Sequence, residues 1–72
     1  MEAKVGGKYR HYKGNQYQIL AIARSSENVD EELVVYQDLS DASKIWARPR
    51  AMFEEEVEVE GKRMPRFTYL GE

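Results

Sequence analysis

The stretch KYRHYKGNQYQILAIARS, residues 8–25, has the pattern of a β-hairpin, and the rest of the chain is interpreted from it. A strand is expected at about residues 7–12, and a second, strongly apolar strand at about residues 17–25. Gly14-Asn15 suits a two-residue turn, because glycine takes the first central position of a type II′ turn. This turn predicts three cross-strand pairs: Tyr12 with Tyr17, His11 with Gln18, and Tyr9 with Leu20.

Short apolar stretches separated by turn signals continue to the end of the chain. Strands are expected at about residues 33–37 and 44–48, and RAMFEE after Pro49 predicts a single helical turn. EVEVEGKRM predicts a second hairpin with its turn at Glu60-Gly61, and PRFTYLGE supplies a last short strand. Two cross-strand pairs are expected in the second hairpin: Glu58 with Arg63, and Val57 with Met64.

Together these segments predict an all-β protein, a small SH3-like barrel of five or six short strands with one single-turn helix near residues 49–53. Residues 1–72 would form a single domain. An OB-type barrel is the alternative, but it usually needs a longer chain and a longer helix. A domain of this size has a thin core, so most of its aromatic rings are expected inside, with two or three left exposed.

Four stretches, KYRHYKGNQYQILAIARSSE, ELVVYQDL, IWARPRAMFEEEV and GKRMPRF, resemble a small bacterial domain family that carries only a label of unknown function. The resemblance covers nearly the whole chain, and the HYKG, WARP and PRF motifs are its most specific parts. It implies an SH3-like β-barrel in a short bacterial protein. It implies no activity, substrate or catalytic residue.

The composition excludes several classes of protein. The chain has no cysteine, which excludes a disulfide framework, a thiolate metal site and a thiol nucleophile. No signal peptide is predicted, and the longest apolar run, residues 19–23, is too short to span a bilayer. A cytoplasmic protein without membrane contact is therefore expected. The chain has 11 basic and 13 acidic residues, a net charge of −2, so nucleic-acid binding would need a local basic face.

His11 is the only histidine and the first candidate for chemistry. A transition-metal site needs several nitrogen or sulfur ligands, which the chain lacks, so no metal and no cofactor are predicted. A hydrolase-type site would combine His11 with Ser25 or Ser26 and Glu27, but no strained elbow or oxyanion loop surrounds these serines. They instead suit a turn. The chain is therefore predicted not to be an enzyme.

Aromatic and basic residues supply the main candidate for a binding surface. Rings beside arginines can hold extended peptides or stack on unpaired bases. The candidate ligand-binding residues are His11, Tyr12, Tyr17, Arg24, Trp46, Arg48 and Arg66. The alternative is structural: the rings belong to the core, and the arginines pair with the acidic segments 27–32 and 54–60.

Two binding hypotheses follow from these residues. The first is a non-catalytic adaptor module for a peptide, a protein partner or a small ligand, present as a monomer or weak homodimer. The second is a binder of single-stranded nucleic acid or nucleotides, which would use the same rings with Arg10, Lys13, Arg24 and Arg66. The first is preferred, because the chain has no overall positive charge to hold a phosphate backbone.

Overall fold

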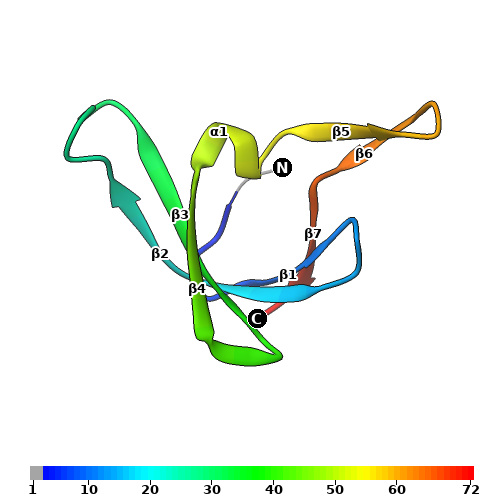
Figure 1. Cartoon of the computed structure of the whole chain (residues 1–72), viewed down its shortest axis with the longest axis horizontal. Helices are drawn as coiled ribbons and strands as arrows, with labels where there is room; N and C mark the ends of the chain where they lie inside the picture. Colours follow the sequence, from blue (N-terminus) through cyan, green and yellow to red (C-terminus); the bar gives the residue numbers. More distant parts are fainter. Residues whose placement is uncertain (1–2) are drawn as a thin grey trace.

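A five-stranded antiparallel sheet forms the main body of the protein in the computed structural model, which describes residues 3–72 (Figure 1). Its strands, in sheet order, are β4 (Asp41–Pro49), β3 (Glu32–Asp38), β2 (Gln16–Arg24), β1 (Lys8–His11) and β7 (Phe67–Gly71). A separate two-stranded sheet consists of β5 (Glu56–Val59) and β6 (Lys62–Pro65), and α1 (Arg50–Phe53) connects β4 to β5. Within residues 3–72, no helix has the length and apolar character needed to cross a membrane.

The order of these elements is that of an SH3-like barrel. Strands β1 to β4 pair in sequence order, α1 makes one turn after Pro49, and β7 returns to pair with β1. The sheet curves around the core, and the β5–β6 hairpin extends away from it (Figure 1). The predicted all-β barrel with one short helix is confirmed. The described residues form seven strands rather than five or six: five in the main sheet and two in the β5–β6 hairpin.

Aromatic rings fill the centre of the barrel. Phe53 of α1 and Phe67 of β7 stack face to face, with ring centroids 4.0 Å apart and an interplanar angle of 9°. Tyr9 and Tyr36 meet Phe53 at steep angles. Aliphatic side chains complete the buried layer: Ala3, Ile19 and Val34. Three rings remain exposed, those of Tyr12, Trp46 and Tyr69, which confirms the expected division between core and surface rings.

The first hairpin differs in register from the prediction. The predicted pairs of Tyr12 with Tyr17, His11 with Gln18 and Tyr9 with Leu20 are wrong. The strands instead place Lys8 opposite Gln18, Tyr9 opposite Tyr17 and Arg10 opposite Gln16. The N–H of Gly14 donates to the carbonyl of His11, and the N–H of His11 donates to that of Asn15, which closes a three-residue loop. Gly14 has a φ of +113°, a conformation that residues with side chains rarely adopt.

Burial explains this register. A shift by an odd number of residues moves the side chains of a strand to the opposite face of the sheet. The observed register places Tyr9 beside Tyr17 on the core face, whereas the predicted one sets Tyr9 against Leu20. Leu20 lies at a β-bulge between Ile19 and Ala21 and is 41% exposed, so it offers Tyr9 no core partner.

The second hairpin has the predicted register. Two of its pairs are those expected from the sequence: Val57 with Met64, and Glu58 with Arg63. At its turn, Glu60 and Gly61 have positive φ values of 52° and 78°, as a type I′ turn requires. Turn chemistry and alternation along the strands are both local, so the sequence alone was sufficient to predict this hairpin.

Candidate functional site

Phe67 connects the aromatic core to a group of basic side chains at the surface. His11, at the end of β1, meets the Phe67 ring edge-on, with centroids 5.0 Å apart. The guanidinium carbon of Arg48, in β4, lies 5.8 Å from the centroid of the same ring. Arg66 directly precedes Phe67, and its carbonyl accepts a 2.9 Å hydrogen bond from the N–H of Tyr12. The fold therefore gathers residues from three separate segments around one ring.

Arg48 is held in place without being neutralised. Its Nε donates a 3.2 Å hydrogen bond to the hydroxyl of Tyr36. Arg48 lies opposite Val34 in the β3–β4 pair, so its side chain starts on the core face of the sheet. None of the acidic side chains within residues 3–72 forms an ion pair with it. The two Nη groups of Arg48 are therefore available to an external acceptor.

Arg66 is neutralised by a neighbouring acid but keeps one unsatisfied donor. Its Nη2 lies 2.8 Å from Oε1 of Glu55, and its side chain is only 18% exposed. Its Nε is buried and has no hydrogen-bond acceptor in the part of the chain that the structure describes. Because a buried donor without an acceptor raises the free energy of the folded state, an oxygen supplied from outside would be favourable here.

His11 contributes a hydrogen-bond donor without a charge. The backbone N–H of Lys13 donates to Nδ1 of His11 at 3.2 Å, so the neutral ring carries its hydrogen on Nε2. Burial lowers the pKa of His11, and the positive charges of Arg48, Arg66 and Lys13 lower it further. The imidazole is therefore neutral at about pH 7.

Two exposed rings border these basic groups. Trp46 is 50% exposed and lies opposite Tyr36, two residues before Arg48 on the same face of β4. Tyr12 is 37% exposed and packs on His11, with ring centroids 4.5 Å apart. We call five residues the aromatic–basic surface: His11, Tyr12, Trp46, Arg48 and Arg66.

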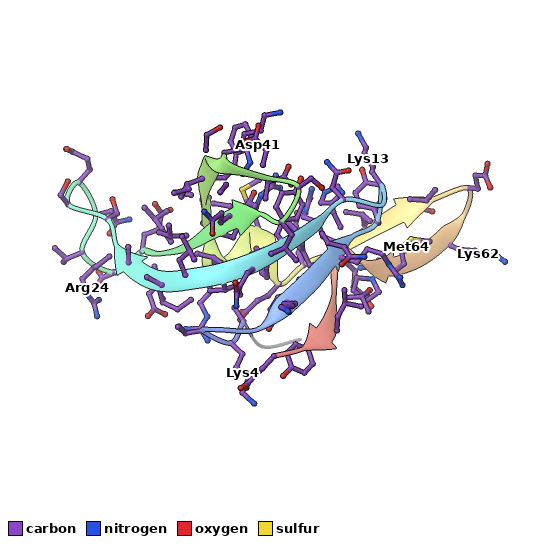
Figure 2. All side chains as sticks on the ribbon, turned by 90° about the horizontal axis from the view of Figure 1, so that it is seen from below. Lys4, Lys13, Arg24, Asp41, Lys62 and Met64 are labelled. Atoms are coloured by element: carbon purple, nitrogen blue, oxygen red, sulfur yellow. The ribbon has the colours of Figure 1, made fainter. Side chains whose placement is uncertain are left out.

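The other two candidate residues lie apart from this surface. Tyr17 is half-buried, and its ring meets those of Tyr36 and Phe67 edge-on at 5.2 and 6.0 Å, so it packs with the core. Arg24 lies at the end of β2 that is far from the β1–β2 loop (Figure 2). Its guanidinium donates a 2.7 Å hydrogen bond to the carbonyl of Val29. Arg24 therefore stabilises the β2–β3 loop and takes no part in the aromatic–basic surface.

Sequence reasoning missed the two residues on which the aromatic–basic surface rests. The hydroxyl of Tyr36 positions Arg48, and the ring of Phe67 contacts both Arg48 and His11. Alternation along β3 identifies Tyr36 as an inward residue, since it lies two positions after Val34. No local signal places Phe67 beside Arg48, because that contact joins distant parts of the chain.

A groove of about 700 Å³ lies elsewhere, between the β2–β3 loop and α1. We call it the acidic groove, because half of its lining residues are acidic. The lining consists of Asn28, Asp30, Glu31, Glu32, Pro49, Arg50, Ala51 and Glu54. Arg50 bridges two of these acids, with Nη1 3.1 Å from Glu32 and Nε 3.0 Å from Glu54. Burial raises the pKa of Glu54, but hydrogen bonds from the Ala3 N–H and from Arg50 outweigh it and leave that pKa below its ordinary value.

The sequence also allowed a purely structural role, in which the arginines pair with the acidic segments 27–32 and 54–60. Only some of the arginines do so. Arg50 and Arg66 pair with acidic segments, as that alternative expects, whereas Arg48 does not. Within residues 3–72, no group of three or more His, Cys, Asp or Glu side chains is arranged to hold a metal ion. The unpaired guanidinium of Arg48 is therefore the feature that sets this part of the molecule apart.

Comparison with known proteins relates the chain to one family. The model of the family described as "Protein of unknown function (DUF1653)" matches residues 7–69. The chain is also similar to a crystal structure of a DUF1653 protein from Bordetella bronchiseptica, with a TM-score of 0.80 and 37% sequence identity. That similarity covers 94% of this chain and 88% of the other. None of the curated proteins matches the chain.

Proposed function

We propose that this chain, which belongs to the DUF1653 family of proteins of unknown function, is a non-catalytic binding module that uses the aromatic–basic surface. The observation that carries this proposal is the state of Arg48. Its guanidinium is fixed by Tyr36 and packed near Phe67, yet it has no acidic partner within residues 3–72. A positioned and unpaired guanidinium binds an external acceptor without a large cost in side-chain entropy.

Binding is favoured over catalysis by the way the polar groups are used. The hydroxyl of Ser25, the candidate nucleophile, accepts hydrogen bonds of 3.2 Å from the N–H groups of Glu27 and Asn28. It thereby shapes the β2–β3 loop, the turn role expected from the sequence. His11 uses Nδ1 to accept the N–H of Lys13 at the opposite end of β2. These contacts leave Ser25 and His11, the two groups of the suggested hydrolase, at opposite ends of β2.

The position of β4 supports a peptide or protein as the partner. β4 is an edge strand of the five-stranded sheet, so one side of its backbone is not paired within that sheet. Trp46 and Arg48 both belong to this strand. An extended peptide could therefore add to the edge of β4 while its side chains meet the two residues. The cytoplasmic location and the monomeric or weakly dimeric state stay predictions from the sequence.

A fragment titration followed by amide NMR tests this proposal. Neutral, cationic and anionic small molecules would be added separately to the isotope-labelled chain. We expect signals of residues 11–13, 46–48 and 66–67 to shift, and Arg48→Gln to weaken those shifts. Arg50→Gln is the matched control, because Arg50 lies in the acidic groove. Shifts confined to that groove, or none with any fragment, would contradict the proposal.

Binding of single-stranded nucleic acid is the second candidate function, favoured by one observation. The exposed Tyr12 ring lies 5.8 Å from the Nζ of Lys13, and Trp46 is also exposed, so bases could stack between basic groups. Trp46 is the only tryptophan, so its fluorescence reports on this surface directly. Oligothymidylate should quench it, and the affinity should fall as salt rises, because phosphate contacts release counterions. Unchanged fluorescence at low salt would eliminate this candidate.

A further inference from the structure

We infer that the aromatic–basic surface binds a monoanionic carboxylate carried on an apolar or aromatic group, and that Arg48 holds the carboxylate. This inference rests on the proposed function and specifies the ligand of the same surface. Two kinds of molecule present this chemistry: a small aromatic acid, and the carboxyl terminus of a peptide that ends in an apolar residue.

The free donors of Arg48 fit a carboxylate. Its Nε is occupied by the Tyr36 hydroxyl, and its two Nη groups form no hydrogen bond or ion pair within residues 3–72. A guanidinium presents such a pair of N–H groups in a planar fork, which matches the two oxygens of a carboxylate. Because Tyr36 is itself buried, the fork is held at a defined position on β4.

Two further donors belong to the aromatic–basic surface. His11 presents an Nε2–H and meets Phe67 at 5.0 Å, and Arg66, the residue before Phe67, has a buried Nε without an acceptor in the described residues. An anion bound by Arg48 near Phe67 would supply oxygens to a region rich in unsatisfied N–H groups.

The charge at the surface favours one negative charge on the ligand. Glu55 compensates Arg66 at 2.8 Å, and His11 is neutral at about pH 7, so Arg48 is the uncompensated charge beside Phe67. Lys13 lies at the edge of the surface, with its Nζ 5.8 Å from the Tyr12 ring centroid, and its charge is exposed to solvent and screened by it. A dianionic phosphate would keep a partly unpaired charge in a half-buried setting, which costs more than binding a monoanion.

The surrounding rings favour an apolar body next to the carboxylate. Trp46 starts on the same face of β4 as Arg48 and is 50% exposed, and Tyr12 packs on His11 and is 37% exposed. Flat exposed rings beside a charged anchor provide apolar area for an aromatic or aliphatic group. The acidic groove lacks this combination, because no aromatic side chain lines it and its cation, Arg50, is already paired with Glu32 and Glu54.

Matched pairs of acid and amide test the inference. N-acetyl-Ala-Phe with a free carboxylate would be compared with its C-terminal amide, and phenylacetate with phenylacetamide, by Trp46 fluorescence and amide NMR. Each acid should bind at least about tenfold more tightly than its amide, as expected for a charge-assisted hydrogen bond. If the peptide acid binds more tightly than phenylacetate, a peptide terminus is the ligand source; the reverse order indicates a small acid.

Variants identify the residue that holds the carboxylate. Arg48→Gln should reduce the affinity for each acid to that for its amide, and Arg48→Lys should give an intermediate loss, because lysine keeps the charge but not the fork. Arg50→Gln should leave binding unchanged, and well-dispersed NMR spectra would show that each variant folds. Inorganic phosphate should compete poorly.

Three outcomes would overturn the inference. They are equal binding of acid and amide at the same residues, stronger competition by phosphate than by the acids, and no binding of either pair. Equal binding would leave the proposed binding module intact and remove only its carboxylate specificity. If neither pair binds, the fragment titration decides separately whether the surface binds anything else.

Discussion

At the scale of single residues, the Phe67 ring sets the environment of the basic side chains around it. Phe67 lies against His11 and Arg48, and it directly follows Arg66. Burial against this ring and the positive charges around it keep His11 neutral. The sequence predicted His11, Arg48 and Arg66 as candidates by residue type. It did not predict that Arg66 has an acidic partner and Arg48 has none, because ion pairing depends on distances across the fold.

The pKa of His11 predicts how stability changes with pH. Because this pKa is lower in the folded chain than in the unfolded chain, the unfolded chain binds a proton first as the pH falls below about 6.5. The contribution of His11 to stability is therefore complete above that pH and is lost as the pH falls toward the folded-state pKa. Denaturant unfolding between about pH 8 and pH 5 should show this loss, with a slope below the 1.4 kcal/mol per pH unit of one full proton.

His11→Asn is the variant that isolates this effect, since an amide oxygen can still accept the N–H of Lys13. Its stability should vary less with pH than that of the wild type. The single histidine also gives one imidazole NMR signal, so its pKa can be measured directly. Arg48→Gln should raise that pKa, whereas Arg10→Gln, on an exposed position of β1, should not. A pKa at or above the ordinary value would contradict the prediction.

At the scale of elements, the two hairpins show why one register was predictable and the other was not. In β5–β6, the turn residues and the alternation of charged and apolar side chains select the same pairing. In β1–β2, Gly14-Asn15 fits a tight turn equally well by its residue types. The longer loop forms because it brings Tyr9 and Tyr17 to the core face, a gain that depends on elements far along the chain.

The turn of β5–β6 provides a prediction for stability. Glu60 has a φ of 52°, a left-handed conformation that costs a residue with a side chain about 1 kcal/mol and that asparagine tolerates better. Glu60→Asn should therefore raise the free energy of unfolding by about 0.5 kcal/mol, because Asn-Gly is preferred in type I′ turns. Chemical denaturation measures this gain. Glu58→Asn, a strand position on the same hairpin, should give none, and equal effects of the two changes would refute the turn argument.

At the scale of the whole molecule, stacked rings replace the aliphatic core that a longer chain could build. Phe53 and Phe67 come from α1 and β7 and form the centre of the barrel, in a chain of 72 residues. Both rings have less than 2% of their surface exposed. A domain of this size buries a smaller fraction of its unfolded-chain surface than a larger domain does, so each large ring carries a substantial share of its stability.

Phe53→Leu and Phe67→Leu should separate stability from binding. Each change should lower the free energy of unfolding by about 1–3 kcal/mol, because a leucine leaves part of the ring volume empty and ends the stacking. Only Phe67→Leu should also alter the pKa of His11 and weaken ligands of the aromatic–basic surface. Within residues 3–72, the ring contact of His11 and the cation–π contact of Arg48 are with Phe67 and not with Phe53. Thermal unfolding and the His11 NMR titration measure the two effects. If both variants changed binding equally, Phe67 would have no special role.

The sequence by itself determined the all-β class, the short helix after Pro49, the β5–β6 register and the division of rings between core and surface. These features depend on turn residues, periodicity and composition, which are properties of neighbouring residues. Only the tertiary structure decided the β1–β2 register, the separation of Arg24 from the other candidates, and the unpaired state of Arg48. Each of these depends on contacts between distant segments, where burial of the Phe53–Phe67 centre outweighs local preference.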